Sequence, residues 1–217
     1  MSETTNRVLV AAGLILLALV ALWLERSGTM HAVYWLGLVV GGAMIFEFLA
    51  CLWRAPRDVM FNGKNLAVFA GFLALLCLDF VSLMRIGHRP MIILMILAIV
   101  CLADIGAWLF GRVIGGDKLW EKVSEHKTWA GQIFGVICGT LAAIAYGHLF
   151  LKSFAPQLVW IGISVSLLSQ YGDLTASFVK RKLKIKDFSN VLGNHGGVID
   201  RFDGWIYVLP IMLYVLM

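Results

Sequence analysis

Residues 91–111 read MIILMILAIVCLADIGAWLFG, an apolar run that a single acid, Asp104, interrupts. A helix rises about 1.5 Å per residue, so a run of this length crosses the roughly 30 Å hydrocarbon core of a bilayer. Six similar runs lie at residues 8–24, 30–53, 66–84, 132–151, 155–179 and 197–217. The sequence therefore predicts an all-α, polytopic integral membrane protein with about seven transmembrane helices in a single transmembrane domain, residues 1–217.

The composition supports a membrane protein and excludes a soluble globular domain. Of the 217 residues, 60% are hydrophobic and 14% are charged, and the mean hydropathy is +0.86. The run at residues 8–24 lacks a convincing small-residue cleavage site after it, so we interpret it as a retained span and not as a signal peptide. The cysteines lie in apolar runs without CxxC spacing, which predicts buried thiols. They are Cys51, Cys77, Cys101 and Cys138.

The distribution of cations predicts the orientation in the membrane. With about seven spans, the side that holds the N-terminus carries 13 of the 18 Lys and Arg residues, and the other side carries four, with Arg201 inside the last run. By the positive-inside rule, the N-terminus and the longer loops near 54–65, 112–131 and 180–196 are cytoplasmic. We expect the bacterial inner membrane, an active site that faces the cytoplasm, and no nucleic-acid partner.

Glycines recur at helical spacing in two of the runs. Gly131, Gly135 and Gly139 are four residues apart, as are Gly37 and Gly41. Such faces let another helix approach closely, either across a dimer interface or within one chain, and packing within the chain is the more general outcome by about two to one.

Four acids fall toward the cytoplasmic ends of three predicted helices. They are Asp104, Asp173, Asp200 and Asp203. An ionised carboxylate in hydrocarbon costs a few kcal/mol, so each needs a partner or a function. For any single acid, a salt bridge to Arg112, Lys180, Arg181 or Arg201 is about as good an explanation as a functional site. Taken jointly, clustered carboxylates suit Mg²⁺, which is held by one or two acids plus substrate phosphates, and the nearby lysines and arginines suit those phosphates.

Spacing refines this predicted cluster. Asp173, Ser177 and Lys180 share one helix face, and so do Asp200 and Asp203. Glu47 lies at a similar predicted depth, whereas Asp79 lies nearer the opposite side of the membrane.

The stretch LGNHGG, residues 192–197, precedes a helix that we expect to begin near Val198. Flexible backbone with free N–H groups at this place could receive an anion. On this pattern, a hydrogen bond within the loop and a catalytic role explain the lone His195 about equally well.

Several motifs resemble one enzyme family. The segment SFVKRKLKIKDFSNVLGNHGGVIDRFD, residues 177–203, resembles the signature of phosphatidate cytidylyltransferases, with Gly193-Asn194 where that signature has Pro-Gly. The segments DIGAWLFGR, SEHKTWAG and SQYGDLTAS resemble further elements of the family, in its order. The resemblance covers roughly residues 104–204 and suggests a divergent, short member.

The resemblance implies a helical membrane enzyme, usually a homodimer, that joins CTP to phosphatidic acid or a similar lipid phosphate with a divalent metal. By position, Asp173 and Asp200 would bind Mg²⁺, with a second cation left open. The phosphate site would include Lys180, Arg181, Lys186, His195 and Arg201. Further substrate-binding positions would be Asp104, Lys127, Thr128, Ser177, Asp187 and Asp203.

Other functions stay open at this point. A related CTP-dependent enzyme could act on another lipid phosphate, or could be a kinase that phosphorylates a lipid alcohol. A transporter is disfavoured, because the acids lie in the cytoplasmic half and Asp79 is the only candidate relay toward the other side. A noncatalytic scaffold is the remaining alternative.

Overall fold

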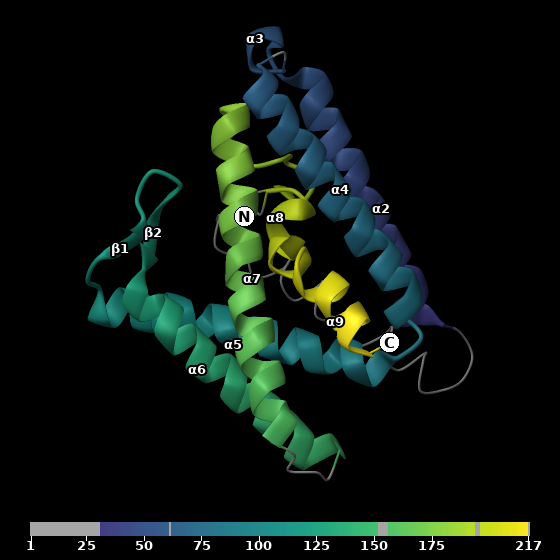
Figure 1. Ribbon diagram of the computed structural model, residues 1–217, viewed down its shortest axis with the longest axis vertical. Helices are drawn as coiled ribbons and strands as arrows, with labels where there is room; N and C mark the ends of the chain where they lie inside the picture. Colours follow the sequence, from purple (N-terminus) through teal and green to yellow (C-terminus); the bar gives the residue numbers. More distant parts are fainter. Residues whose placement is uncertain (1–30, 61, 152–155, 194–195, 217) are drawn as a thin grey trace. The chain divides into compact units, whose positions relative to one another are not determined.

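The computed structural model describes residues 31–60, 62–151, 156–193 and 196–216 (Figure 1). The chain divides into two compact units, which are described separately below. The first unit comprises Met1–Pro90 and Val179–Met217, and the second comprises Met91–Phe178. The predicted first span, residues 8–24, lies outside the described residues.

Two long helices form one side of the first unit. Helix α2 (Ala32–Arg54) packs beside helix α4 (Gly63–Ile86), and the short helix α3 (Arg57–Met60) joins them (Figure 1). Helix α2 ends where Pro56 follows in the sequence, because the residue before a proline is driven into extended backbone, as Ala55 is at φ −67° and ψ 142°. The side chain of Asn62 caps α4 by accepting a hydrogen bond from the Lys64 N–H at 3.1 Å.

The C-terminal part of the chain completes the first unit. Helix α8 (Ile199–Phe202) is followed by a 3-10 turn (Asp203–Trp205) and helix α9 (Val208–Leu216), which packs on α4. The start of α8 confirms the helix expected near Val198. The apolar run at residues 197–217 does not form one continuous helix as expected, because the 3-10 turn breaks it after Phe202. Fully buried side chains, among them Phe48, Phe72 and Leu209, form the core of the unit.

The second unit is built from three helices and a hairpin. Helix α5 (Pro90–Ile114) leads into strands β1 (Lys118–Trp120) and β2 (Ser124–Thr128). Helix α6 (Trp129–Tyr146) follows and ends in a π-helical turn (Gly147–Leu151). Helix α7 (Pro156–Leu183) belongs to this unit as far as Phe178. The strands pair antiparallel, with Lys118 opposite Thr128. The sequence had predicted only a loop here. The Trp120 ring stacks on Phe178, with centroids 5.8 Å apart, and so ties the hairpin to α7.

The glycine faces are used within the chain. On α6, Gly131 lies against Gly111, Gly135 against Ala103, and Gly139 against Ser166. In the first unit, Gly37 and Gly41 lie against Leu83 and Phe80 of α4. The structure thus has the intrachain packing that the sequence analysis favoured, so the glycine spacing gives no argument for a dimer.

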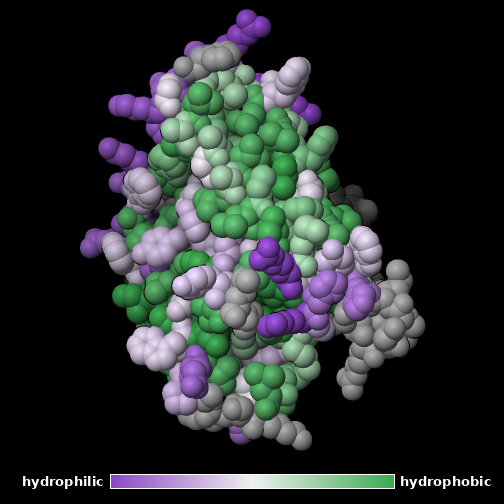
Figure 2. All heavy atoms as spheres, turned by 45° about the vertical axis from the view of Figure 1, so that its right-hand side comes forward, coloured by the Kyte–Doolittle hydropathy of each residue, from purple (hydrophilic) through white to green (hydrophobic). Residues whose placement is uncertain are grey.

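Four helices among the described residues are long and apolar enough to cross a membrane. They are Ala32–Arg54, Gly63–Ile86, Pro90–Ile114 and Trp129–Leu151. Figure 2 shows a broad hydrophobic surface over α2 and α4, with hydrophilic residues toward the end where α3 lies. These features confirm a helical membrane protein. The helix α7 also forms where a span was expected, but it carries the buried polar residues Ser166, Ser169 and Gln170 and is not one of the four.

Replacing Gly135 with alanine should destabilise the second unit. An added Cβ would lie 3.0 Å from the Ala103 carbonyl oxygen, so two helices would have to move apart. We expect a cost of about 1–3 kcal/mol, seen as a lower unfolding midpoint of the purified protein in detergent. Gly42→Ala is the matched control, because a Cβ there meets no atom within 4 Å. Equal midpoints for the two variants would contradict this packing.

Candidate functional site

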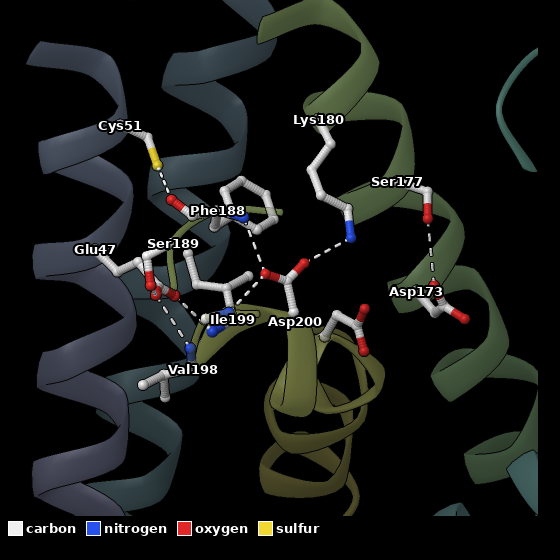
Figure 3. A network of polar contacts seen from close by, with 12 residues as sticks. Glu47, Cys51, Asp173, Ser177, Lys180, Phe188, Ser189, Val198, Ile199 and Asp200 are labelled. Atoms are coloured by element: carbon white, nitrogen blue, oxygen red, sulfur yellow. Dashed lines mark hydrogen bonds and ion pairs between the residues drawn. The ribbon is translucent and has the colours of Figure 1, made fainter. Parts of the chain in front are cut away.

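Asp200, in the first turn of α8, is a buried acid whose charge is fully paired. Its Oδ1 accepts a hydrogen bond from the Lys180 Nζ at 2.6 Å, and its Oδ2 accepts from the N–H groups of Phe188 and Gly197, both at 2.9 Å (Figure 3). Burying a carboxylate is costly unless such partners replace its water. The acid therefore connects the end of α7, the α7–α8 loop (residues 185–198) and α8.

The end of α7 places Lys180 for this contact. The Ile185 N–H donates to the Lys180 carbonyl at 3.0 Å and the Lys184 N–H donates to the Arg181 carbonyl at 3.2 Å, the two bonds of a Schellman motif. Lys184 takes the left-handed conformation that this motif requires, at φ 59°. The chain consequently leaves the helix at once and begins the α7–α8 loop within reach of Lys180.

Phe188 anchors the α7–α8 loop in the apolar core. Its ring stacks on Phe72, with centroids 5.9 Å apart, and lies 6.2 Å from the Phe48 ring. The Lys180 Nζ is 5.6 Å from the centroid of the same ring. The buried phenyl group fixes the backbone position from which the Phe188 N–H reaches Asp200.

A second buried acid, Glu47 of α2, holds the loop from the other side. Its Oε1 accepts from the Ser189 hydroxyl and from the Val198 N–H at 3.1 Å, and its Oε2 accepts from the Ile199 N–H at 2.7 Å (Figure 3). One helical turn later, the Cys51 thiol donates to the Phe188 carbonyl at 2.6 Å. The sequence indicated the depth of Glu47, but its pattern did not predict Glu47, Ser189 or Cys51 as site residues.

The paired glycines of the loop lie against these two acids. Gly196 has φ +76°, and a Cβ on it would lie 2.9 Å from the Asp200 Oδ2. A Cβ on Gly197 would overlap the Glu47 carboxylate. A side chain at either position would displace an acid, so the Gly-Gly pair is required for close approach of the backbone.

The N–H groups described around the glycines, outside residues 194–195, are already bonded, whereas free N–H groups were expected for an anion. The Gly197 N–H is taken by Asp200, and those of Val198 and Ile199 are taken by Glu47. The Leu192 N–H donates to the Gly196 carbonyl at 3.0 Å and closes a turn. The predicted role of His195 lies outside the described residues.

In the second unit, Asp173 of α7 is also paired. Its Oδ1 accepts from the Ser177 hydroxyl at 3.3 Å, which confirms that the two share a helix face, and its Oδ2 forms an ion pair with Lys127 of β2. The next residue, Thr128, is buried and caps α6 by accepting from the Gly131 N–H at 3.1 Å. The hairpin thus positions Lys127 beside Asp173. The sequence pattern did not predict this pairing.

Other predicted residues have exposed side chains. They are Asp104, Arg181, Lys186, Asp187 and Arg201. The Asp203 Oδ1 accepts from the Gly204 N–H at 2.9 Å at the start of the 3-10 turn. Since Asp104 and Asp173 belong to the second unit and Asp200 and Asp203 to the first, the predicted cluster of four acids stays a prediction.

The oxygen donors of the two paired acids are compatible with a hard cation. Among the described residues, no group of three or more His, Cys, Asp or Glu side chains converges on one point. Each Asp173 oxygen and the Asp200 Oδ1 has one protein partner, so each keeps a lone pair. Within its own unit, each acid therefore offers an oxygen to a cation held by one or two carboxylates, water and phosphates, as is usual for Mg²⁺.

The model of the cytidylyltransferase family matches residues 1–217. The chain is similar to the phosphatidate cytidylyltransferase of Brucella suis, with 35% identity over 85% of this chain and 67% of the relative. It is also similar to the enzymes of that name from Staphylococcus haemolyticus, with 40% identity over 52% of this chain, and Staphylococcus aureus strain COL, with 42% identity over 52%. The chain spans 44% of the length of each staphylococcal relative.

Replacing Lys180 with methionine should strongly destabilise the first unit. The lysine and Asp200 side chains are 14% and 5% exposed, so the variant leaves a buried carboxylate without its cation. We expect a cost of about 3–5 kcal/mol in chemical unfolding. Lys184→Met is the matched control at the end of the same helix. Its ion pair with Asp58 is 3.5 Å long and about 70% exposed on both sides, so its loss should cost at most about 1 kcal/mol. Similar losses of unfolding free energy in both variants would contradict the larger contribution expected from the buried ion pair.

Proposed function

Because the chain belongs to the cytidylyltransferase family, whose model matches residues 1–217, we propose that it forms CDP-diacylglycerol and pyrophosphate from CTP and phosphatidic acid. This match to the family model is the observation on which the proposal rests. The similarity to the phosphatidate cytidylyltransferases of Brucella suis and Staphylococcus haemolyticus supports the same activity. The chain would then act in phospholipid biosynthesis.

The reaction requires charge neutralisation and positioning more than a strong base. An oxygen of the lipid phosphate attacks the α-phosphorus of CTP and forms the new P–O bond. The bond from that phosphorus to the oxygen that bridges to the β-phosphate breaks, and pyrophosphate leaves with the electron pair. A phosphate monoester is already nucleophilic at neutral pH, so the enzyme mainly has to hold two anionic substrates in line.

Cations of the first unit are suited to bind these phosphates. Lys180 has its ammonium fixed beside Asp200 at 2.6 Å, and Arg181, Lys186 and Arg201 have exposed side chains. Guanidinium and ammonium groups bind phosphate oxygens with charge-assisted hydrogen bonds. We assign these four residues and His195 to the phosphate site. Further substrate contacts are assigned to Asp104, Lys127, Thr128, Ser177, Asp187 and Asp203.

Asp173 and Asp200 are the proposed ligands of Mg²⁺. Each acid has oxygen lone pairs left after its protein contacts, which supports the assignment. When bound, the ion would supply positive charge to the phosphates and to the departing pyrophosphate. A lysine beside each acid would share that task.

We also propose seven transmembrane helices with the N-terminus and the active site on the cytoplasmic side of a bacterial inner membrane. The excess of cations on the N-terminal side of the predicted topology and the bacterial relatives support this orientation. CTP arrives from water and the lipid head group lies at the membrane surface, so a site at this boundary reaches both. A homodimer is proposed from the family resemblance alone.

Asp173→Asn and Asp200→Asn should each abolish formation of CDP-lipid, with a loss of about 100-fold or more. Asparagine keeps the size of the acid but removes the charge that a cation and the lysines require. The measurement is transfer of α-labelled CTP into lipid by purified protein, with Mg²⁺ present or absent. Asp58→Asn, which removes an exposed acid from the same protein, is the control and should retain full activity. Normal turnover in either site variant would exclude the metal assignment.

The position of the label separates the proposed reaction from its nearest alternative. A cytidylyltransferase places the α-phosphorus and cytidine in the lipid product. A CTP-dependent kinase would instead transfer the terminal phosphate to a lipid alcohol. Label from γ-labelled CTP in the lipid, with none from α-labelled CTP, would overturn the proposed function.

A further inference from the structure

Glu47 is a buried acid in a candidate membrane span, and among the described residues its hydrogen-bond donors all belong to one segment of the chain. It is 6% exposed, and its three donors are the Ser189 hydroxyl, the Val198 N–H and the Ile199 N–H. An acid at such a position costs several kcal/mol unless it is paired. In the part of the chain that the structure describes, Glu47 forms no ion pair and takes all three of its hydrogen bonds from this segment. These bonds therefore hold the segment against α2.

The three donors lie in the first half of the α7–α8 loop and at its junction with α8. Ser189 follows Phe188, whose N–H is bonded to Asp200, and Ile199 directly precedes Asp200. The first N–H groups of a helix have no acceptor inside the helix, and Glu47 supplies acceptors for Val198 and Ile199 where α8 begins. The direction in which the Asp200 side chain leaves the backbone is thus set by a residue about 150 positions earlier in the chain.

We propose that Glu47 is a positioning residue, which acts through the α7–α8 loop to hold Asp200 and its partner Lys180 where substrate phosphates meet them. The catalytic consequence rests on the proposed function, whereas the anchoring of the loop does not. Cys51 lies on the same face of α2 and bonds the Phe188 carbonyl at 2.6 Å, so α2 holds the loop at two successive turns.

Glutamine cannot replace Glu47 in this role. An amide has one acceptor oxygen, whereas the carboxylate uses both oxygens to receive three donors. In Glu47→Gln, the amide N–H₂ group would face at least one backbone N–H. Two donors that face each other leave both unsatisfied, so the loop should detach from α2.

Cys51 provides a direct readout of loop attachment. Its thiol is half-buried and bonded to the loop, so release of the loop frees it for reaction with N-ethylmaleimide. Labelling of the full-length protein in detergent, resolved by peptide mass spectrometry, compares all cysteines in one sample. In Glu47→Gln we expect Cys51 to react up to about tenfold faster, the factor that one lost net hydrogen bond gives. Cys138, also half-buried, is the internal control and should not change.

Asp79→Asn is the matched control variant. Asp79 is a second buried acid of the first unit, 2% exposed, and its Oδ1 has no hydrogen-bond partner within the described ranges. Its replacement makes the same change from a buried acid to its amide without touching the loop, so Cys51 labelling and turnover should match the wild type. Ser189→Ala removes one of the three donors and should give a smaller increase in labelling, a milder test if Glu47→Gln does not fold.

Turnover completes the test. Glu47→Gln should lower kcat for CDP-lipid formation about tenfold or more. Its unfolding midpoint should fall less than that of Lys180→Met, so that the variant stays folded in the assay. Unchanged Cys51 labelling in Glu47→Gln and Ser189→Ala would overturn the anchoring. Faster labelling with unchanged kcat would overturn the positioning role. If the wild type forms no CDP-lipid, the proposed function fails, and labelling still decides whether Glu47 anchors the loop.

Discussion

The ion pair between Asp200 and Lys180 is the contact on which the geometry of the first unit depends. A carboxylate that is 5% exposed has to find replacements for the water it loses, and it finds them in a lysine and two backbone N–H groups. Those partners come from α7, from Phe188 and from Gly197, which are separated in the sequence. Satisfying one buried charge therefore brings three segments into a single arrangement.

Glu47 is a second buried carboxylate that needs hydrogen-bond donors in place of water, and it takes them from the other side of the loop. Between the two acids, the backbone has to pass so closely that neither Gly196 nor Gly197 could carry a side chain. The Gly-Gly pair had suggested a flexible segment with N–H groups open to an anion. The N–H groups described there are instead used inside the protein, so in the proposed site the cationic side chains around the loop would bind the phosphates.

The helices could be predicted from the sequence because hydropathy is a local property. The runs at 30–53, 66–84 and 91–111 became α2, α4 and α5 with small changes at their ends. The last run was mispredicted as one helix, since its apolar composition does not reveal the 3-10 turn after Phe202. The hairpin of residues 118–128 was missed as well, because its charged strands carry no apolar alternation and depend on the stacking of Trp120 on Phe178.

The sequence by itself determined the class of the protein, the family motifs and the acids that needed an explanation. It did so because a membrane span and a charge within it are visible in any short window. Only the tertiary structure decided which partner each acid takes: Lys180 for Asp200, Lys127 for Asp173 and the loop backbone for Glu47. Such pairings join residues far apart in the chain, and no local pattern specifies which of several nearby cations or N–H groups reaches a given carboxylate.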